Sequence, residues 1–156
     1  MNRKIATFAA GCFWGVEAAF GKLEGVISTV VGYIGGTVKE PDYRLVCTGT
    51  TGYAEAVQVT YDTDVISYKQ LLESFFQMHN PTTPNRQGAD YGSQYRSAIF
   101  YHDQDQKSAA KEVLGFLDAS KVFRYPIVTE IVPAAVFYRA EEYHQRYYEK
   151  HGLLHC

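Results

Sequence analysis

The order of hydrophobic patterns along the chain constrains its fold most strongly. A strand pattern, a helix pattern and a second strand pattern follow one another, and the same triplet then repeats. Strands are expected from apolar or alternating runs, and helices from apolar residues three or four positions apart. The expected strands cover residues 5–10, 26–34, 54–61, 95–101 and 126–132. This order predicts an α+β fold of the ferredoxin-like, split βαβ type, in which a mixed sheet and helices form a two-layer sandwich.

Four helices are expected between and after these strands. The first covers residues 14–23, and two others start at Ser67 and Asp103, each of which is followed three positions later by Gln in capping-box spacing. The last helix is predicted at residues 140–151, where one face would carry Tyr143, His144, Tyr147 and His151.

Two irregular segments, residues 35–53 and 80–92, interrupt the regular patterns with turn-forming residues. Loops of this length in a compact domain are usually functional or disordered, and the aromatic and cysteine residues of the first segment favour a function. The sequence shows no repeats or linker-like stretches. We therefore expect one domain over residues 1–156, with an irregular tail at about 151–156.

Composition argues against several kinds of partner. The net charge is −2 and the Lys and Arg residues are scattered, so no basic surface for nucleic acid is expected. No run approaches the roughly 20 apolar residues of a membrane span. Three cysteines, Cys12, Cys47 and Cys156, are too few and too spread for a disulfide scaffold. These features predict a soluble, cytoplasmic protein.

Cys12 lies in the sequence Gly-Cys-Phe-Trp-Gly, where the first strand is expected to end and the first helix to begin. The positive end of a helix dipole stabilises a thiolate, so this position favours a reactive cysteine. A buried structural thiol is the alternative. Phe13 and Trp14 either form an apolar cage for a methyl group, including one bound to sulfur, or are ordinary core aromatics.

Glu55 shares a strand face with Val57 and Val59, so the alternation of the strand points its carboxyl toward the core. A desolvated carboxyl has a raised pKa and stays protonated near neutrality, as a general acid must. The alternative is that Glu55 reaches solvent past the rim of the strand.

Three further polar residues lie in or beside the irregular segments: Tyr43, Asp90 and Tyr95. Each has the chemistry to donate or orient hydrogen bonds at a site, and each also suits a turn or surface position. His144 is more typical of a satisfied helix histidine.

Five motifs occur in the order in which a known family has them. They are "GCFWG", "GYIGG", "YRLVCTGTTGYAEAV", "NPTTPNRQGADYGSQYRS" and "AEEYHQRYY". The chain thus resembles the type A methionine sulfoxide reductases, the peptide-methionine (S)-S-oxide reductases, from about residue 8 to 148. Enzymes of this class reverse the oxidation of methionine to its sulfoxide.

The resemblance implies that Cys12 is the nucleophile and that Glu55 is the acid that protonates the sulfoxide oxygen. Tyr43 and Tyr95 match hydrogen-bonding helpers, and Asp90 matches an acidic residue near the substrate. Two aromatic residues match the pocket for the S-methyl group, namely Phe13 and Trp14.

The resemblance also implies a reaction cycle. Its substrate is methionine sulfoxide, either as the free amino acid or in oxidised proteins, and Cys12 becomes a sulfenic acid. Cys156 matches the recycling cysteine, which forms a disulfide with Cys12 that a thioredoxin-type dithiol reduces, and no cofactor is implied. Two positions depart from many relatives: Tyr53 stands where they have His, and Asn80 where they have Asp.

Two alternatives stay open at this point. One is a module that binds a metal through residues of the first loop and the tail, namely Cys47, His151, His155 and Cys156. The cysteines lack the Cys-x-x-Cys spacing typical of zinc sites. The other alternative is a generic thiol peroxidase, in which Cys12 attacks peroxides.

Overall fold

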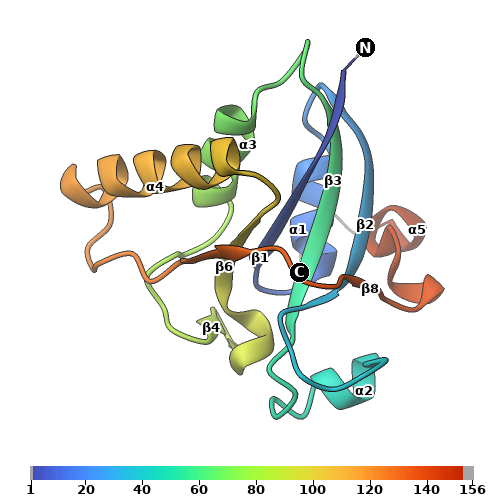
Figure 1. Ribbon diagram of the computed structural model, residues 1–156. Helices are drawn as coiled ribbons and strands as arrows, with labels where there is room; N and C mark the ends of the chain where they lie inside the picture. The colour runs from blue at the N-terminus through green and yellow to red at the C-terminus, as the bar shows by residue number, and fades with distance from the viewer. Residues whose placement is uncertain (1, 153–156) are drawn as a thin grey trace.

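A computed structural model describes residues 2–152 of the chain, and a six-stranded sheet forms its centre (Figure 1). Its strands are β1 (Arg3–Ala10), β2 (Val26–Ile34), β3 (Ala54–Asp62), β6 (Ser97–Tyr101), β7 (Glu130–Pro133) and β8 (Tyr138–Arg139). They are arranged in the order β7-β6-β1-β3-β2-β8. Strands β6 and β7 are parallel and the other neighbours antiparallel, so the sheet is mixed.

The sheet has the split βαβ topology that the sequence predicts. Strands β1 and β2 are joined through helix α1 (Phe13–Gly21), yet β3 lies between them. Strands β3 and β6 are joined through helix α3 (Tyr68–Gln77), and β1 lies between them. The two units therefore interleave, which confirms the α+β, ferredoxin-like prediction.

The three long helices cover one face of the sheet. The ring of Phe8 on β1 stacks on Phe20 of α1 at 5.0 Å and on Phe75 of α3 at 5.2 Å, so both helices pack on the same side of the strand. Helix α4 (Gln104–Ala119) adds Ala110 and Val113 to this core. The other face carries a smaller cluster of mainly small residues, and the chain between β7 and β8 crosses it (Figure 1).

Short elements fill the two irregular segments. The first contains the four-residue helix α2 (Tyr43–Val46), and the second contains a hairpin of β4 (Arg86–Gln87) and β5 (Asp90–Tyr91). The 3₁₀ turn η1 (Ser93–Tyr95) follows the hairpin. These elements place polar and aromatic side chains at the end of the sheet where β1 meets α1.

Most predicted boundaries are confirmed within a few residues. Ser67 and Gln70 form a reciprocal capping box at the start of α3. Asp103 also caps its helix, but the Gln106 side chain accepts from His102 N–H instead of completing a box. Strand β7 starts later than predicted, at Glu130.

The predicted continuous helix at 140–151 is wrong. The chain forms a 3₁₀ turn, η2 (Glu142–His144), and then the short helix α5 (Tyr147–His151), separated by Arg146 with a left-handed φ of 50°. Tertiary hydrogen bonds cause the break. The Gln145 side chain bonds both backbone groups of Val31 on β2, and the Arg146 N–H donates to Glu17 at 2.6 Å. The proposed shared face is also absent, because His144 is fully buried while Tyr143 is 57% exposed.

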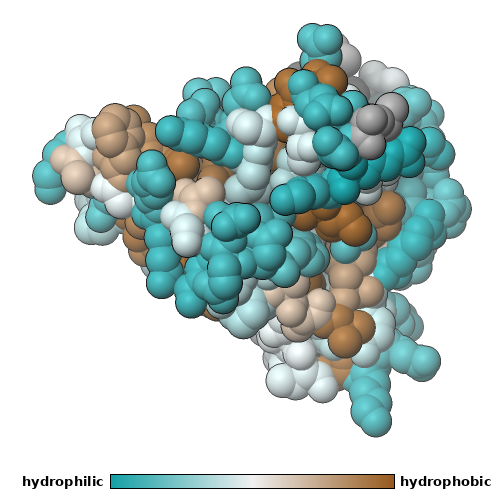
Figure 2. Space-filling view, turned by 45° about the horizontal axis from the view of Figure 1, so that its top comes forward, coloured by the Kyte–Doolittle hydropathy of each residue, from teal (hydrophilic) through white to brown (hydrophobic). Residues whose placement is uncertain are grey.

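The surface in Figure 2 is mainly hydrophilic, with separate hydrophobic groups, one of them at the end of the molecule that carries α4. Phe116 of that helix is 70% exposed. Among the described residues, no helix combines the length and apolar character needed to cross a membrane.

Candidate active site

Cys12 is half-buried and forms the N-cap of α1, directly after the end of β1. The turn between the two elements requires glycine at position 11, where φ is +98°. A Cβ atom on Gly11 would also lie 2.8 Å from Cγ of Gln87, a residue of the β4–β5 hairpin. The second irregular segment is therefore packed against the backbone that presents the thiol.

Glu55 lies on the helix-covered face of β3 and is only 1% exposed. The alternative that its carboxyl reaches solvent is therefore wrong. Burial raises the pKa of Glu55 to about 8, although a hydrogen bond from Phe13 N–H to Oε1 at 3.2 Å opposes the shift. The carboxyl is therefore mostly protonated at neutral pH. Its Oε2 atom has no hydrogen-bond partner within residues 2–152.

The hydrogen bond between Phe13 and Glu55 fixes the relation of acid and thiol. Phe13 is the first residue of α1, and its N–H is one of the backbone donors that a helix leaves unpaired. Because Cys12 immediately precedes it, the buried carboxyl is bound one residue away from the thiol.

Two tyrosines extend this group. Tyr43 begins α2, and its hydroxyl is hydrogen-bonded to the Cys47 side chain. Burial raises the pKa of both Tyr43 and Tyr95, and the nearby charge of Glu55 adds to the effect at each. Both phenols therefore keep their protons and remain hydrogen-bond donors at neutral pH. The charges of Asp90 and Cys12 also raise the pKa of Tyr95, so both groups lie close enough to interact with its phenol.

Phe13 and Trp14 point into different surroundings. The Phe13 ring is 1% exposed and lies 5.7 Å from the ring of Tyr33 and 5.2 Å from that of His144. Trp14 is half-buried and stacks on Tyr147 with ring centroids 3.8 Å apart.

His144 connects the two aromatic residues. Trp14 Nε1 donates to His144 Nδ1 at 2.9 Å, so the imidazole is neutral with its proton on Nε2. Burial lowers the pKa of His144 in the same direction. The contacts of His144 and Tyr147 with Trp14 were not predicted from the sequence, because the local pattern places both residues on one continuous helix. Their presence in the motif "AEEYHQRYY" is the signal that marks this segment.

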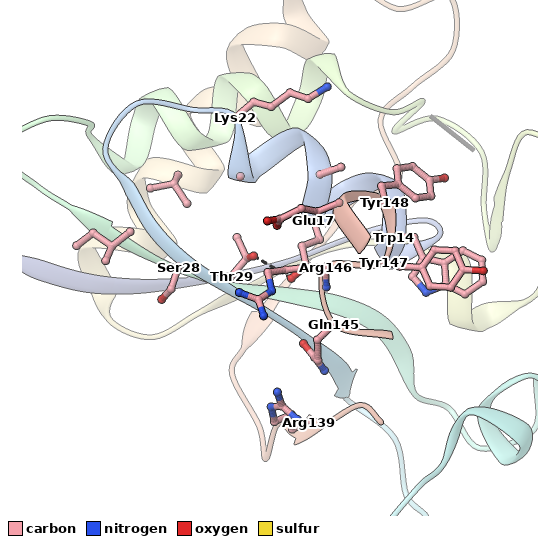
Figure 3. Close-up of a pocket in the computed structure, with 15 residues that line it drawn as sticks. Trp14, Glu17, Lys22, Ser28, Thr29, Arg139, Gln145, Arg146, Tyr147 and Tyr148 are labelled. Atoms are coloured by element: carbon pink, nitrogen blue, oxygen red, sulfur yellow. Dashed lines mark hydrogen bonds between the residues drawn. The ribbon is translucent and has the colours of Figure 1, made fainter. Parts of the chain in front are cut away.

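A pocket of about 650 Å³ lies on the far side of Trp14, between α1, β2 and the α5 segment (Figure 3). Its polar walls include Glu17, Lys22, Arg139 and Arg146. Neither Cys12 nor Glu55 lines it. The pocket is therefore separate from the thiol, and the chemistry of the buried acid argues for the site at Cys12.

The two departures from the relatives are structural in this chain. Tyr53 is buried, donates a hydrogen bond to the Val38 carbonyl, and packs where a Cβ on Gly36 would clash with its ring. Asn80 accepts from the Thr82 N–H at 3.0 Å within its own loop. Both stabilise the irregular segments.

Cys47 is exposed and lies beside Tyr43, and Asp90 is exposed on β5. Cys156 and His155 lie outside the described residues. Over residues 2–152, no three His, Cys, Asp or Glu residues are grouped closely enough to hold a metal ion.

The site places a thiol at a helix N-terminus, next to a protonated carboxyl and two protonated phenols. This arrangement is that of an enzyme in which a thiol reacts and a neighbouring acid donates a proton. The chain belongs to the peptide methionine sulfoxide reductase family, which it matches over residues 4–156. It is therefore an oxidoreductase that reduces methionine sulfoxide to methionine.

Individual relatives agree with this assignment. The chain is 58% identical over 149 residues to the peptide methionine sulfoxide reductase MsrA of Methanosarcina acetivorans, covering 96% of this chain and 79% of that protein. It is similar to reduced Mxr1 from Saccharomyces cerevisiae, with a TM-score of 0.90, 37% identity and coverage of 96% and 86%. It also resembles Mxr1 in complex with Trx2, with a TM-score of 0.66, 28% identity and coverage of 93% and 84%.

Proposed function

We propose that Cys12 reduces the S diastereomer of methionine sulfoxide, with Glu55 as the proton donor. The observation that carries this proposal is the burial of Glu55, which raises its pKa to about 8, together with its bond to the residue after Cys12. Tyr43 and Tyr95 donate further hydrogen bonds to the sulfoxide oxygen, and Asp90 binds substrate at the rim of the site. A single catalytic domain over residues 1–156 carries the whole reaction.

The first step transfers oxygen from one sulfur to another. The Cys12 thiolate attacks the sulfoxide sulfur while Glu55 protonates the oxygen, because negative charge develops there as the bond breaks. The bond between the two sulfurs and the original S–O bond then break as oxygen becomes bonded to the Cys12 sulfur, so Cys12 is left as a sulfenic acid and methionine leaves as the thioether. Two electrons have then passed from the cysteine to the substrate.

The substrate methyl group occupies an apolar position beside Trp14, with Phe13 beneath it. One face of the Trp14 indole is already covered by Tyr147, so the substrate methyl group would contact the other face. A methyl group held there, an oxygen held by Glu55 and the fixed direction from which Cys12 attacks set three positions around the sulfoxide sulfur, so only one configuration can react. Selectivity between diastereomers follows from these three fixed positions.

The proposal is tested by supplying each diastereomer of methionine sulfoxide separately, with a small dithiol as reductant. We expect consumption of the S form only, measured as methionine released, and little turnover of hydrogen peroxide. Equal rates with both diastereomers would contradict the pocket assignment. Faster turnover of peroxide than of the S form would favour a generic thiol peroxidase.

A second thiol must then reduce the sulfenic acid, and we propose that Cys156 does so. The two cysteines form a disulfide and release water, and a thioredoxin-type dithiol reduces the disulfide by thiol exchange. The complex of Mxr1 with Trx2 supports a thioredoxin as this partner. These thiols supply all electrons without a cofactor, and a reducing cytoplasm suits them.

Cys47 is the rival for this role. It lies near the proposed site, but partial desolvation and the charges of Glu55 and Glu141 raise the pKa of its thiol. Less of it is therefore thiolate at neutral pH, which makes it the poorer nucleophile.

In Cys156→Ser we expect a burst of about one methionine per enzyme, because the first step needs only Cys12. Steady-state turnover with thioredoxin should collapse, while a small dithiol should partly restore it. Cys47→Ser is the matched control and should turn over normally. A Cys12–Cys47 linkage in oxidised wild type, found by mass spectrometry together with normal thioredoxin turnover in Cys156→Ser, would transfer the role to Cys47.

A further inference from the structure

Glu141 lies between β8 and η2, and its carboxylate binds three separate parts of the chain. Oε1 accepts from the Tyr33 hydroxyl of β2 at 2.8 Å. Oε2 accepts from the backbone N–H of Tyr43 at 3.1 Å and from the Tyr143 hydroxyl at 3.4 Å. Partial burial favours the neutral form of this carboxyl, but the hydrogen bonds outweigh that effect and hold its pKa below the ordinary value. The group is therefore ionised and accepts from all three donors.

The bond to Tyr43 holds an element that has little support of its own. Helix α2 is only four residues long, and its N-cap Asp42 accepts from Leu45 N–H, which leaves the Tyr43 N–H to an outside partner. Glu141 is that partner. The orientation of the Tyr43 ring therefore depends on this carboxylate and on the neighbouring ring of His144, 4.3 Å away.

The bond to Tyr33 connects the same carboxylate to the strand pair that carries the acid. Tyr33 on β2 is fully buried and is the register partner of Glu55 on β3. Glu141 thus spans the distance between α2 and this strand pair through its two oxygens.

We infer that Glu141 is a positioning residue, which fixes the Tyr43 phenol relative to Glu55 and Cys12 so that it meets the sulfoxide oxygen. This inference rests on the proposed role of Tyr43 as a hydrogen-bond donor in the reaction. Glu141 itself touches no reacting atom and acts through the placement of α2.

The test is Glu141→Gln, measured in a single turnover that follows the release of methionine. The amide has one neutral acceptor oxygen and donates with its N–H group, so the charge-assisted hydrogen bonds to Tyr33 and Tyr43 are replaced by weaker neutral ones. We expect the rate of methionine release to fall about tenfold, since small displacements of catalytic groups are costly, while the sulfoxide concentration that gives half of the maximal single-turnover rate changes less than about twofold. Glu142→Gln is the matched control, because its exposed carboxylate pairs with Arg139 and Lys150 at the surface, and it should stay within about twofold of wild type.

A double-mutant cycle with Tyr43→Phe separates this role from a general structural one. If Glu141 acts through Tyr43, Glu141→Gln should slow the Tyr43→Phe enzyme less than about twofold. An equal loss in both backgrounds would overturn the inference while leaving the proposed function intact. A Tyr43→Phe enzyme that is as fast as wild type would overturn both the helper role of Tyr43 and the inference. Glu141→Asp keeps the charge with a shorter side chain, and the same cycle run on it decides the question if Glu141→Gln fails to fold.

Discussion

A Cys12→Ser variant is expected to fold normally and to release no methionine from methionine sulfoxide. The serine hydroxyl fits the half-buried position of the thiol at the start of α1, so the core should be undisturbed. An alcohol is a far weaker nucleophile than a thiolate at neutral pH and cannot become a sulfenic acid. Methionine release, followed by chromatography with excess dithiol, should fall to background.

The control for this experiment is Cys47→Ser, which removes a neighbouring thiol that the first step does not use. It should release methionine at the wild-type rate. Circular dichroism and thermal unfolding of both variants show whether the fold is kept. Substantial methionine release by a folded Cys12→Ser protein would contradict the mechanism.

In Glu55→Gln we expect the single-turnover rate at neutral pH to fall about 10²–10⁴-fold, the usual contribution of general acid catalysis. The amide keeps an acceptor for the Phe13 N–H but has no acidic proton to transfer. Binding of methionine sulfoxide should change little, because the side chain keeps its size. A loss of less than about tenfold would show that another group donates the proton.

The pH dependence of the two enzymes sharpens this test. Glu55 is raised to a pKa of about 8, so the wild-type step should slow as pH rises through that value and the acid loses its proton. The Glu55→Gln rate should lack this limb. Rates of both proteins are measured in single turnovers across pH 6–9, and the ratio of the wild-type rate to the Glu55→Gln rate should fall as pH rises through about 8.

The same raised pKa affects stability. In the unfolded chain Glu55 loses its proton near its ordinary pKa of 4.5, whereas in the folded protein it holds the proton to about 8. The folded state therefore binds more protons between these values, and stability falls as pH rises through them. By pH 7 this costs on the order of 3 kcal/mol, a part of which Glu55→Gln should recover in thermal unfolding.

Strands β1, β2, β3 and β6 and helices α1, α3 and α4 could be predicted because their local patterns agree with their packing. Strand β2 was predicted with its observed bounds, since its β-branched run is unambiguous. The 140–151 segment could not be predicted in the same way. Its residues favour a helix locally, but Glu17 and β2 bind the backbone at Arg146 and the side chain of Gln145 from more than 100 positions away.

The positions of Cys12 and Glu55 followed from the sequence for similar reasons. A strand end that leads into a helix marks Cys12, and alternation along β3 places Glu55 on the core face. Glu141, His144 and Tyr147 reach the site only through tertiary contacts. No local pattern encodes which of their faces meets α1 and α2, so their contribution required the structure.

The contact between Trp14 and His144 joins residues 130 positions apart and has a consequence for the newly made protein. A ribosome adding about 5–20 residues per second needs about 6–26 s to span that interval. Throughout it, the nascent chain carries the Cys12 thiol without the aromatic groups that later pack beside Trp14. The aromatic side of the proposed site is thus completed only after residue 144 has been translated, well after the Cys12 thiol beside which it packs.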